Sequence, residues 1–292
     1  MPWIVLALAS AFTMAAADAL LKKFFSDLNA YEMGHLYFFY SAPWMIVPLL
    51  LSPVPQVEIT SWLTMVSLIP LEILALVLYM RAIQISPLSL TIPFLAFTPV
   101  WMIGVGLIVL DELPNLWGGI GILVVAAGAY LLNLDTLSFN HGAGVFEPIK
   151  AIFRERGSRL MLLVSLIYAV TATVGKKLIL DFGDTYFGSM YSLVLMISTG
   201  PAFWASGKLD FRNIITRPGR GLILGLCATL SLLSHVWAMT LAPAAYMMAV
   251  KRLSLVFAVL YGRWLFKEAR FGQRLAGASV MLAGLVLISV WG

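Results

Sequence analysis

The chain has 292 residues, of which 61% are hydrophobic and only 11% charged, and its mean hydropathy is +0.94. A soluble globular domain carries about 25% charged residues, so this inventory cannot cover a water-exposed surface and indicates an integral membrane protein. The net charge of +5 does not call for nucleic acid as a partner, because Lys and Arg gather in short loops between apolar runs. The single cysteine, Cys227, predicts no disulfide, and no metal or cofactor is expected.

A membrane-spanning helix needs about 20 mostly apolar residues, and ten runs of the sequence meet this condition. In chain order they are 2–22, 32–52, 61–83, 87–110, 116–134, 159–180, 186–206, 220–241, 243–265 and 272–291. None of them shows the period-two alternation of a membrane β-barrel. The sequence therefore predicts an all-α integral membrane protein with ten transmembrane helices.

The longest polar segment lies near the middle of the chain. It separates a predicted first five-helix repeat at 1–134 from a second at 159–292, with 135–158 as the loop between them. A shift of 156 residues aligns equivalent positions, namely Ala82 with Ala238, Pro87 with Pro243, Glu112 with Glu268, Gly121 with Gly277, and Gly128 with Gly284. Because five is an odd number, consecutive repeats have opposite orientations in the membrane. Inverted repeats with a site between them are a recurrent transporter architecture.

The repeat ends carry a family resemblance. The stretch from Ser86 to Val100, followed by Leu110-Asp-Glu-Leu113, looks like the end of an EamA-type repeat, and its counterpart begins at Ala242-Pro-Ala-Ala245. The chain thus resembles the drug/metabolite transporter superfamily over essentially its whole length. The resemblance implies two inverted five-helix repeats around a cavity lined mainly by helices 3, 4, 8 and 9. It does not specify a substrate, since members move amino acids, sugars, nucleotide sugars, phosphorylated metabolites and drugs.

Two adjacent cations, Lys251 and Arg252, lie within the predicted span 243–265. Lys251 is eight residues beyond Pro243, about 12 Å along a helix and close to the centre of a roughly 30 Å hydrocarbon core. A charge at that depth costs at least about 2.5 kcal/mol unless a partner or a water-filled cavity compensates it. The pair therefore predicts a solute pathway with a preference for an anionic or zwitterionic guest.

The segment Val250 to Phe257 also resembles the helix-9 lysine–arginine motif of the plastid phosphate translocators, in which that pair binds phosphate. Those proteins carry a further lysine in helix 4, before a proline. Counting back from Pro99, the matching position here is Leu95, which is also the repeat mate of Lys251. The absence of that cation puts a sugar-phosphate substrate in doubt and leaves room for a less charged anion.

Four further residues complete the predicted substrate site: Glu72, His235, Tyr79 and Tyr246. Glu72 is about 15 Å into its span and is expected to be the counter-ion of the cation pair. It could equally receive an amino group or, like His235, titrate as a proton-coupling group, and a purely structural ion pair also stays open. Asp18 is expected to pair with Lys22, four residues along the same helix. Pro93 and Pro99 are expected to interrupt the span 87–110.

Loop charges predict an orientation. Thirteen Lys and Arg residues fall in loops on one face against two, Lys176 and Lys177, on the other. By the positive-inside rule both termini then lie outside the cytoplasm, whereas the resemblance implies both inside. A reporter fusion at Gly292 shows on which side of the membrane the C-terminal residue lies and so decides between the two orientations.

No cluster of nucleophile, base and orienting group indicates an enzyme, and no phosphate-binding glycine loop indicates ATP hydrolysis. The leading interpretation is a secondary active transporter that moves a small anionic or zwitterionic metabolite by alternating access. It would be a multi-pass protein of a bacterial inner membrane, in contact with lipid, as a monomer or homodimer. The alternatives are a non-transporting sensor or assembly subunit, or a lipid-linked sugar flippase of the same fold.

Overall fold

The structure, a computed structural model, describes residues 2–86, 91–134, 155–266 and 271–292, and all regular secondary structure in these ranges is helical. The elements are α1 (Pro2–Phe25), α2 (Ala30–Leu51), α3 (Ile59–Ile85), the 3-10 helix η1 (Ile92–Phe97), α5 (Thr98–Leu110), α6 (Leu116–Leu134), α8 (Arg156–Phe182), α9 (Asp184–Ala205), α10 (Phe211–Ile214), α11 (Pro218–Leu241), α12 (Ala244–Lys251), α13 (Ser254–Phe266) and α14 (Phe271–Trp291). Each predicted span coincides with one helix or with two consecutive ones, so the all-α prediction is confirmed.

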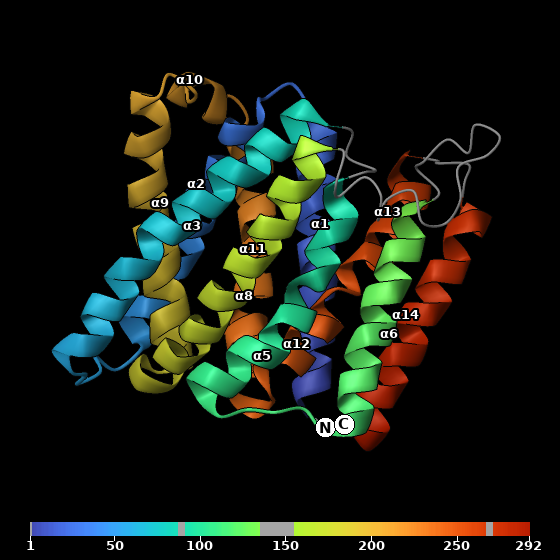
Figure 1. Cartoon of the computed structure of the whole chain (residues 1–292). Coiled ribbons are helices and arrows are strands. Elements are labelled where there is room, and N and C mark those ends of the chain that lie inside the picture. The colour runs from blue at the N-terminus through green and yellow to red at the C-terminus, as the bar shows by residue number, and fades with distance from the viewer. Residues whose placement is uncertain (1, 87–90, 135–154, 267–270) are drawn as a thin grey trace.

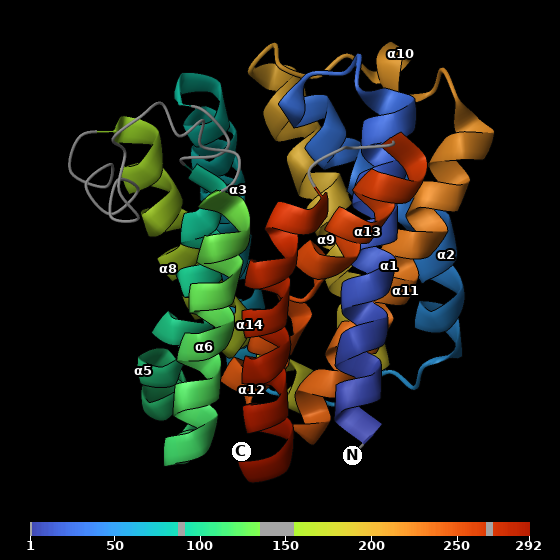
Figure 2. The same cartoon turned by 90° about the vertical axis from the view of Figure 1, so that its right-hand side faces the viewer.

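Many of these helices have the length and apolar composition of membrane spans. Six stretches are long and apolar enough to cross a bilayer, namely Pro2–Phe25, Ala30–Leu51, Ile59–Ile85, Arg156–Phe182, Pro218–Leu241 and Ala244–Leu265. Shorter apolar helices cover Phe94–Leu110, Leu116–Leu132 and Ala276–Trp291. The helices run up and down through one bundle, and both chain ends lie at the same face (Figures 1 and 2).

Helices of the first repeat pack against helices of the second: α6 against α14, α1 against α11, α2 against α9, and α3 against α8. The α6–α14 crossing uses the four glycines that the sequence aligns as repeat mates. An added Cβ on Gly128 would lie 2.9 Å from the carbonyl oxygen of Gly277, and one on Gly121 would lie 3.0 Å from that of Gly284. Glycine at these positions therefore lets the two backbones touch, the usual device for packing helices in lipid.

Two spans are broken at equivalent depths. In the first repeat, η1 gives way to α5 at Thr98, next to the predicted breaker Pro99. In the second repeat, α12 ends at Lys251 and α13 begins at Ser254. Between them the hydrogen bonds shorten to the i→i−3 type, with the N–H of Leu253 donating to Val250 at 3.0 Å. The predicted span 243–265 is confirmed as an apolar stretch of membrane-spanning length, Ala244–Leu265, and the structure adds a local break at the residues that carry the charges.

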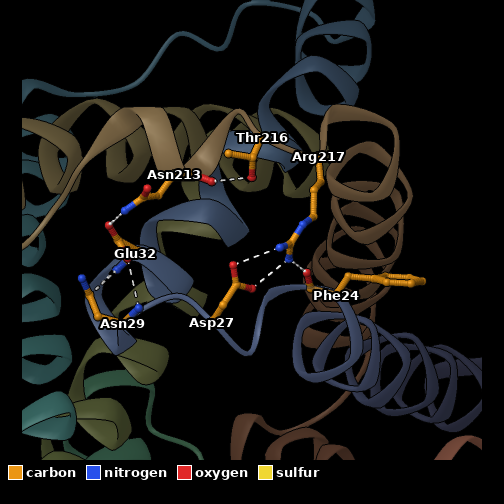
Figure 3. A network of polar contacts seen from close by, with 7 residues as sticks. All are labelled: Phe24, Asp27, Asn29, Glu32, Asn213, Thr216 and Arg217. Carbon is orange, nitrogen blue, oxygen red and sulfur yellow. Dashed lines mark hydrogen bonds and ion pairs between the residues drawn. The ribbon is translucent and has the colours of Figure 1, made fainter.

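A polar network closes the face opposite the termini (Figure 3). Asn29 and Glu32 form a capping box at the start of α2, and Glu32 also accepts a hydrogen bond of 2.8 Å from Asn213. Arg217 donates to both carboxylate oxygens of Asp27, at 2.8 and 3.0 Å, and to the carbonyl of Phe24. These contacts fasten the α1–α2 turn to the segment between α9 and α11.

A second connection lies near the face that carries the termini. Lys176 of α8 forms a salt bridge with Glu112, in the turn between α5 and α6, and donates at 2.6 Å to the carbonyl of Ala242. The other carboxylate oxygen of Glu112 accepts from the N–H of Ala244 at 2.9 Å. This bridge holds the first turn of α12, and hence the helix that carries Lys251, against the first repeat.

Candidate functional site

A central cavity of about 410 Å³ opens beside the break between α12 and α13. Residues of α1, α2, α3, α8, α9, α11, α12 and α13 line it, and those from α9 and α11 lie toward the ends of these helices nearest the termini. A smaller cavity of about 220 Å³ adjoins it and shares five lining residues: Met14, Phe38, Ser192, Leu232 and Lys251. The family resemblance implies that the fourth predicted span lines the cavity, but no described lining residue comes from η1 or α5, which form that span. Helices α8 and α9 contribute the most lining residues.

Lys251 and Arg252 lie at the end of α12, on the wall of the larger cavity. Both side chains are half-buried. Among the described residues neither forms a salt bridge or hydrogen bond through its side chain. Arg252 interacts electrostatically with Tyr168, Tyr79 and the neighbouring Lys251, and none of these is a carboxylate. The two cations are therefore held beside open space without a direct carboxylate partner.

Unpartnered polar atoms converge on the same cavity. Within the described part of the chain, four buried side-chain nitrogen or oxygen atoms have no hydrogen-bond partner. Three of them belong to cavity residues: Nε of Arg252, Nδ1 of His235 and the hydroxyl of Tyr191. An unsatisfied buried donor or acceptor costs about 1–3 kcal/mol, so groups collected around a hollow are suited to a polar guest.

Glu72 of α3 lines the larger cavity together with the cation pair, but among the described residues it forms no salt bridge with either cation. The carboxyl lies near Thr171 and interacts electrostatically with Tyr168 and Tyr191. Tyr168 also interacts electrostatically with Arg252, and all three residues, Glu72 included, line the larger cavity. The cavity thus presents positive and negative groups at separate places on its wall.

Sequence reasoning missed Asp18, which the structure places on the smaller cavity. Its carboxylate is accessible there and interacts electrostatically with Lys251, which lines both cavities. Asp18, rather than Glu72, is therefore the acid that faces Lys251. The sequence did not indicate this role, because an acid four residues before a lysine in a helix is readily explained as half of an ion pair on the helix surface. With Asp18 included, the two cavities hold two acids and two cations.

The remaining predicted residues divide between cavity and core. His235 lines the larger cavity and interacts electrostatically with Lys251. Tyr79 does not line either cavity but is close enough to Asp18 and Arg252 to interact with both. Tyr246 is buried away from them, and its hydroxyl accepts the N–H of Asn115 at 3.1 Å, where it packs over Gly118. In this conformation Tyr246 joins α12 to α6 and is not part of the cavity wall.

The described residues contain no group of three or more His, Cys, Asp or Glu side chains placed to hold a metal ion. The residues that line the cavity offer charge, hydrogen-bonding groups and aromatic surface. Such groups can bind and orient a small polar molecule.

The sequence profile of the EamA-like transporter family matches residues 1–134 and 156–290, that is, most of both halves of the chain. The protein belongs to the EamA-like transporter family. It is accordingly a multi-pass integral membrane protein, a transporter of a small molecule and not an enzyme. No curated protein shows significant similarity to it. A solved structure described as "Crystal structure of protein" has a TM-score of 0.73 at 12% identity, covering 99% of this chain and 95% of that one. That likeness extends over the whole fold of this EamA-like transporter.

Proposed function

We propose that this EamA-like transporter is a secondary active transporter of a small anionic or zwitterionic metabolite, which binds in the central cavity. The observation that carries the proposal is the convergence of Lys251, Arg252 and the unpartnered atoms of His235 and Tyr191 on one hollow. A volume of about 410 Å³ falls in the range of small-molecule sites, roughly 300–1,000 Å³.

The cation pair binds the acidic end of the guest. A guanidinium can hold a carboxylate or phosphate through two parallel hydrogen bonds, while an ammonium acts as a point charge beside it. Glu72, which lines the same cavity, receives an amino group where the guest carries one. This division of charge favours a zwitterion of amino-acid size or a simple organic anion over a multiply charged phosphate.

Transport then proceeds by alternating access. The larger cavity lies toward the face of the termini, while the network around Arg217 and Asp27 closes the opposite face. Inverted repeats allow the reverse arrangement by rocking of one half against the other around a fixed site. The breaks at Thr98 and Ser254 are the natural hinges, because each span is already divided there.

The test is a thermal-shift screen of the purified protein against amino acids, carboxylic acids and inorganic phosphate. A ligand at about 100 times its Kd stabilises the folded state by about 2.7 kcal/mol, which moves the transition measurably. We expect stabilisation of the wild type that is absent in Lys251→Ala. A screen in which no anion or zwitterion stabilises the wild type, or in which Lys251→Ala responds equally, contradicts the proposal.

A further inference from the structure

We infer that Asp18 and Lys251 form a proton-coupling pair, in which Asp18 binds one proton when a substrate with a net negative charge binds Lys251. The inference rests on the proposed function, which it deepens by naming the coupled ion and the group that carries it. The starting observation is geometric: Lys251 lines both cavities, while Asp18 lines only the smaller one. Lys251 thus lies between the acid and the space proposed for the substrate.

The pair is placed to exchange partners. Asp18 and Lys251 interact electrostatically, yet the contacts of the described residues include no direct salt bridge between them. A pair without that contact is not locked by desolvated hydrogen bonds, so the ammonium remains available to a second anion. An anion in the larger cavity competes with Asp18 for the same positive charge.

Charge balance makes a proton the compensating ion. Two ionised carboxylates, Asp18 and Glu72, would offset the charges of Lys251 and Arg252, which line the same two cavities. A monoanionic guest adds one uncompensated negative charge inside the bilayer, which is costly. Protonation of one carboxylate removes it: the carboxylate takes up H⁺ from water and becomes a neutral acid, with no change in electrons. A zwitterion adds no net charge and needs no proton.

Asp18 is the carboxyl whose proton affinity depends on the substrate. The titratable groups that face it from neighbouring helices are Lys251 on α12, Tyr37 on α2 and Tyr79 on α3. Cys227 on α11 lies next to Tyr37, and Lys22 follows one turn along α1. Lys251 is the cation that lines the same cavity as Asp18, so an anion bound at Lys251 weakens its attraction for the Asp18 carboxylate.

Glu72 differs in this respect. Its interaction partners are Thr171 and two tyrosines, and none of them is a cation. An anion bound at Lys251 therefore weakens an attraction to a cation that Asp18 has and Glu72 lacks. By linkage the effect is reciprocal: substrate favours protonation of Asp18, and protonation of Asp18 frees Lys251 and favours substrate.

The first test needs no substrate and uses infrared titration of the carboxyl C=O band in purified protein. We expect a titrating band that is absent in Asp18→Asn and present in the matched control Glu72→Gln. In Lys251→Gln the band should appear at a proton concentration at least tenfold lower than in the wild type, that is, at higher pH. The shift in Arg252→Gln should be smaller. A band that does not respond to Lys251→Gln, or that disappears only in Glu72→Gln, overturns the inference.

The second test uses proteoliposomes with a trapped pH indicator and the anionic ligand found by the thermal-shift screen. Wild type should move one proton with each anion, whereas Asp18→Asn should bind and exchange the anion without moving protons. Equal proton movement by both proteins refutes Asp18 as the coupling group. If the screen returns no ligand, the proposed function fails, and the infrared titration still decides whether Asp18 and Lys251 act as an acid–base pair.

Discussion

Thr98 and Ser254 are 156 residues apart, occupy the same position in the two repeats, and each begins the second half of a broken helix. The residues before them are not equivalent in chemistry. The mates of Lys251 and Arg252 are Leu95 and Ala96, which are apolar. The two breaks therefore occupy equivalent positions in the repeats, but among the described residues only the break in the second repeat borders the cavity and brings positive charge to it.

The glycines at the α6–α14 crossing give a test of how the repeats are joined. Gly128→Ala and Gly277→Ala each place a methyl group against the backbone of the opposite helix. Overpacking of this kind costs about 1–3 kcal/mol, so both variants should unfold at lower temperature than the wild type in detergent. Gly104→Ala is the matched control, because an added Cβ there meets nothing within 4 Å. Equal stability of all three variants would contradict close backbone packing at this crossing.

Removal of one partner of the salt bridge between Lys176 and Glu112 should cost more free energy of unfolding than replacement of both partners together. The Lys176 side chain is only 5% exposed, so Glu112→Gln leaves a buried ammonium with the carbonyl of Ala242 as its remaining partner. Removal of one partner of a buried pair costs about 3 kcal/mol or more. The double variant Lys176→Met, Glu112→Gln should recover part of that loss, as measured by thermal unfolding. Additive losses in the double-mutant cycle would show that the two groups do not depend on each other.

The link between Arg217 and Asp27 predicts a dependence on pH. The hydrogen bonds from Arg217 hold the pKa of Asp27 below its ordinary value of about 3.8. A carboxyl whose pKa is lowered in the folded state contributes stability that is fully present above the unfolded pKa and is lost as pH falls through the folded one. The unfolding temperature of Asp27→Asn should therefore approach that of the wild type in acid and fall below it at neutral pH. The exposed Glu58→Gln is the control and should follow the wild type at neutral pH. If the difference in unfolding temperature between the wild type and Asp27→Asn grows as the pH falls, the stabilising role of the contact between Arg217 and Asp27 is contradicted.

Hydrophobic length alone was enough to predict the helices, and repeated glycines and breakers predicted that the chain is an inverted duplication. Those signals are local or periodic, so they can be recognised in the sequence without knowing how the helices pack. The break before Ser254 was not predictable in that way, because no Pro or Gly lies between Ala244 and Ser254. Its mate at Thr98 was signalled by Pro99.

The site depended on contacts between helices, which sequence reasoning could only approximate. Lys251 and Arg252 stood out because of their depth in an apolar run. The pairing of Lys251 with Asp18 depends on the rotation of α1 about its axis, and Tyr246 lies on the face of α12 that packs against α6. Neither rotation can be calculated from a helix that is apolar on all sides, since such a helix has no clear polar face.

The central claim, that Lys251 and Arg252 bind the travelling solute, is tested most directly by exchange of a radiolabelled ligand from the thermal-shift screen in proteoliposomes. Three variants, Lys251→Ala, Arg252→Ala and the exposed control Lys177→Ala, are compared with wild type after equal folded incorporation has been verified. We expect exchange at the wild-type rate for Lys177→Ala and at least a tenfold loss for each of the other two. Wild-type exchange by both Lys251→Ala and Arg252→Ala would contradict the claim.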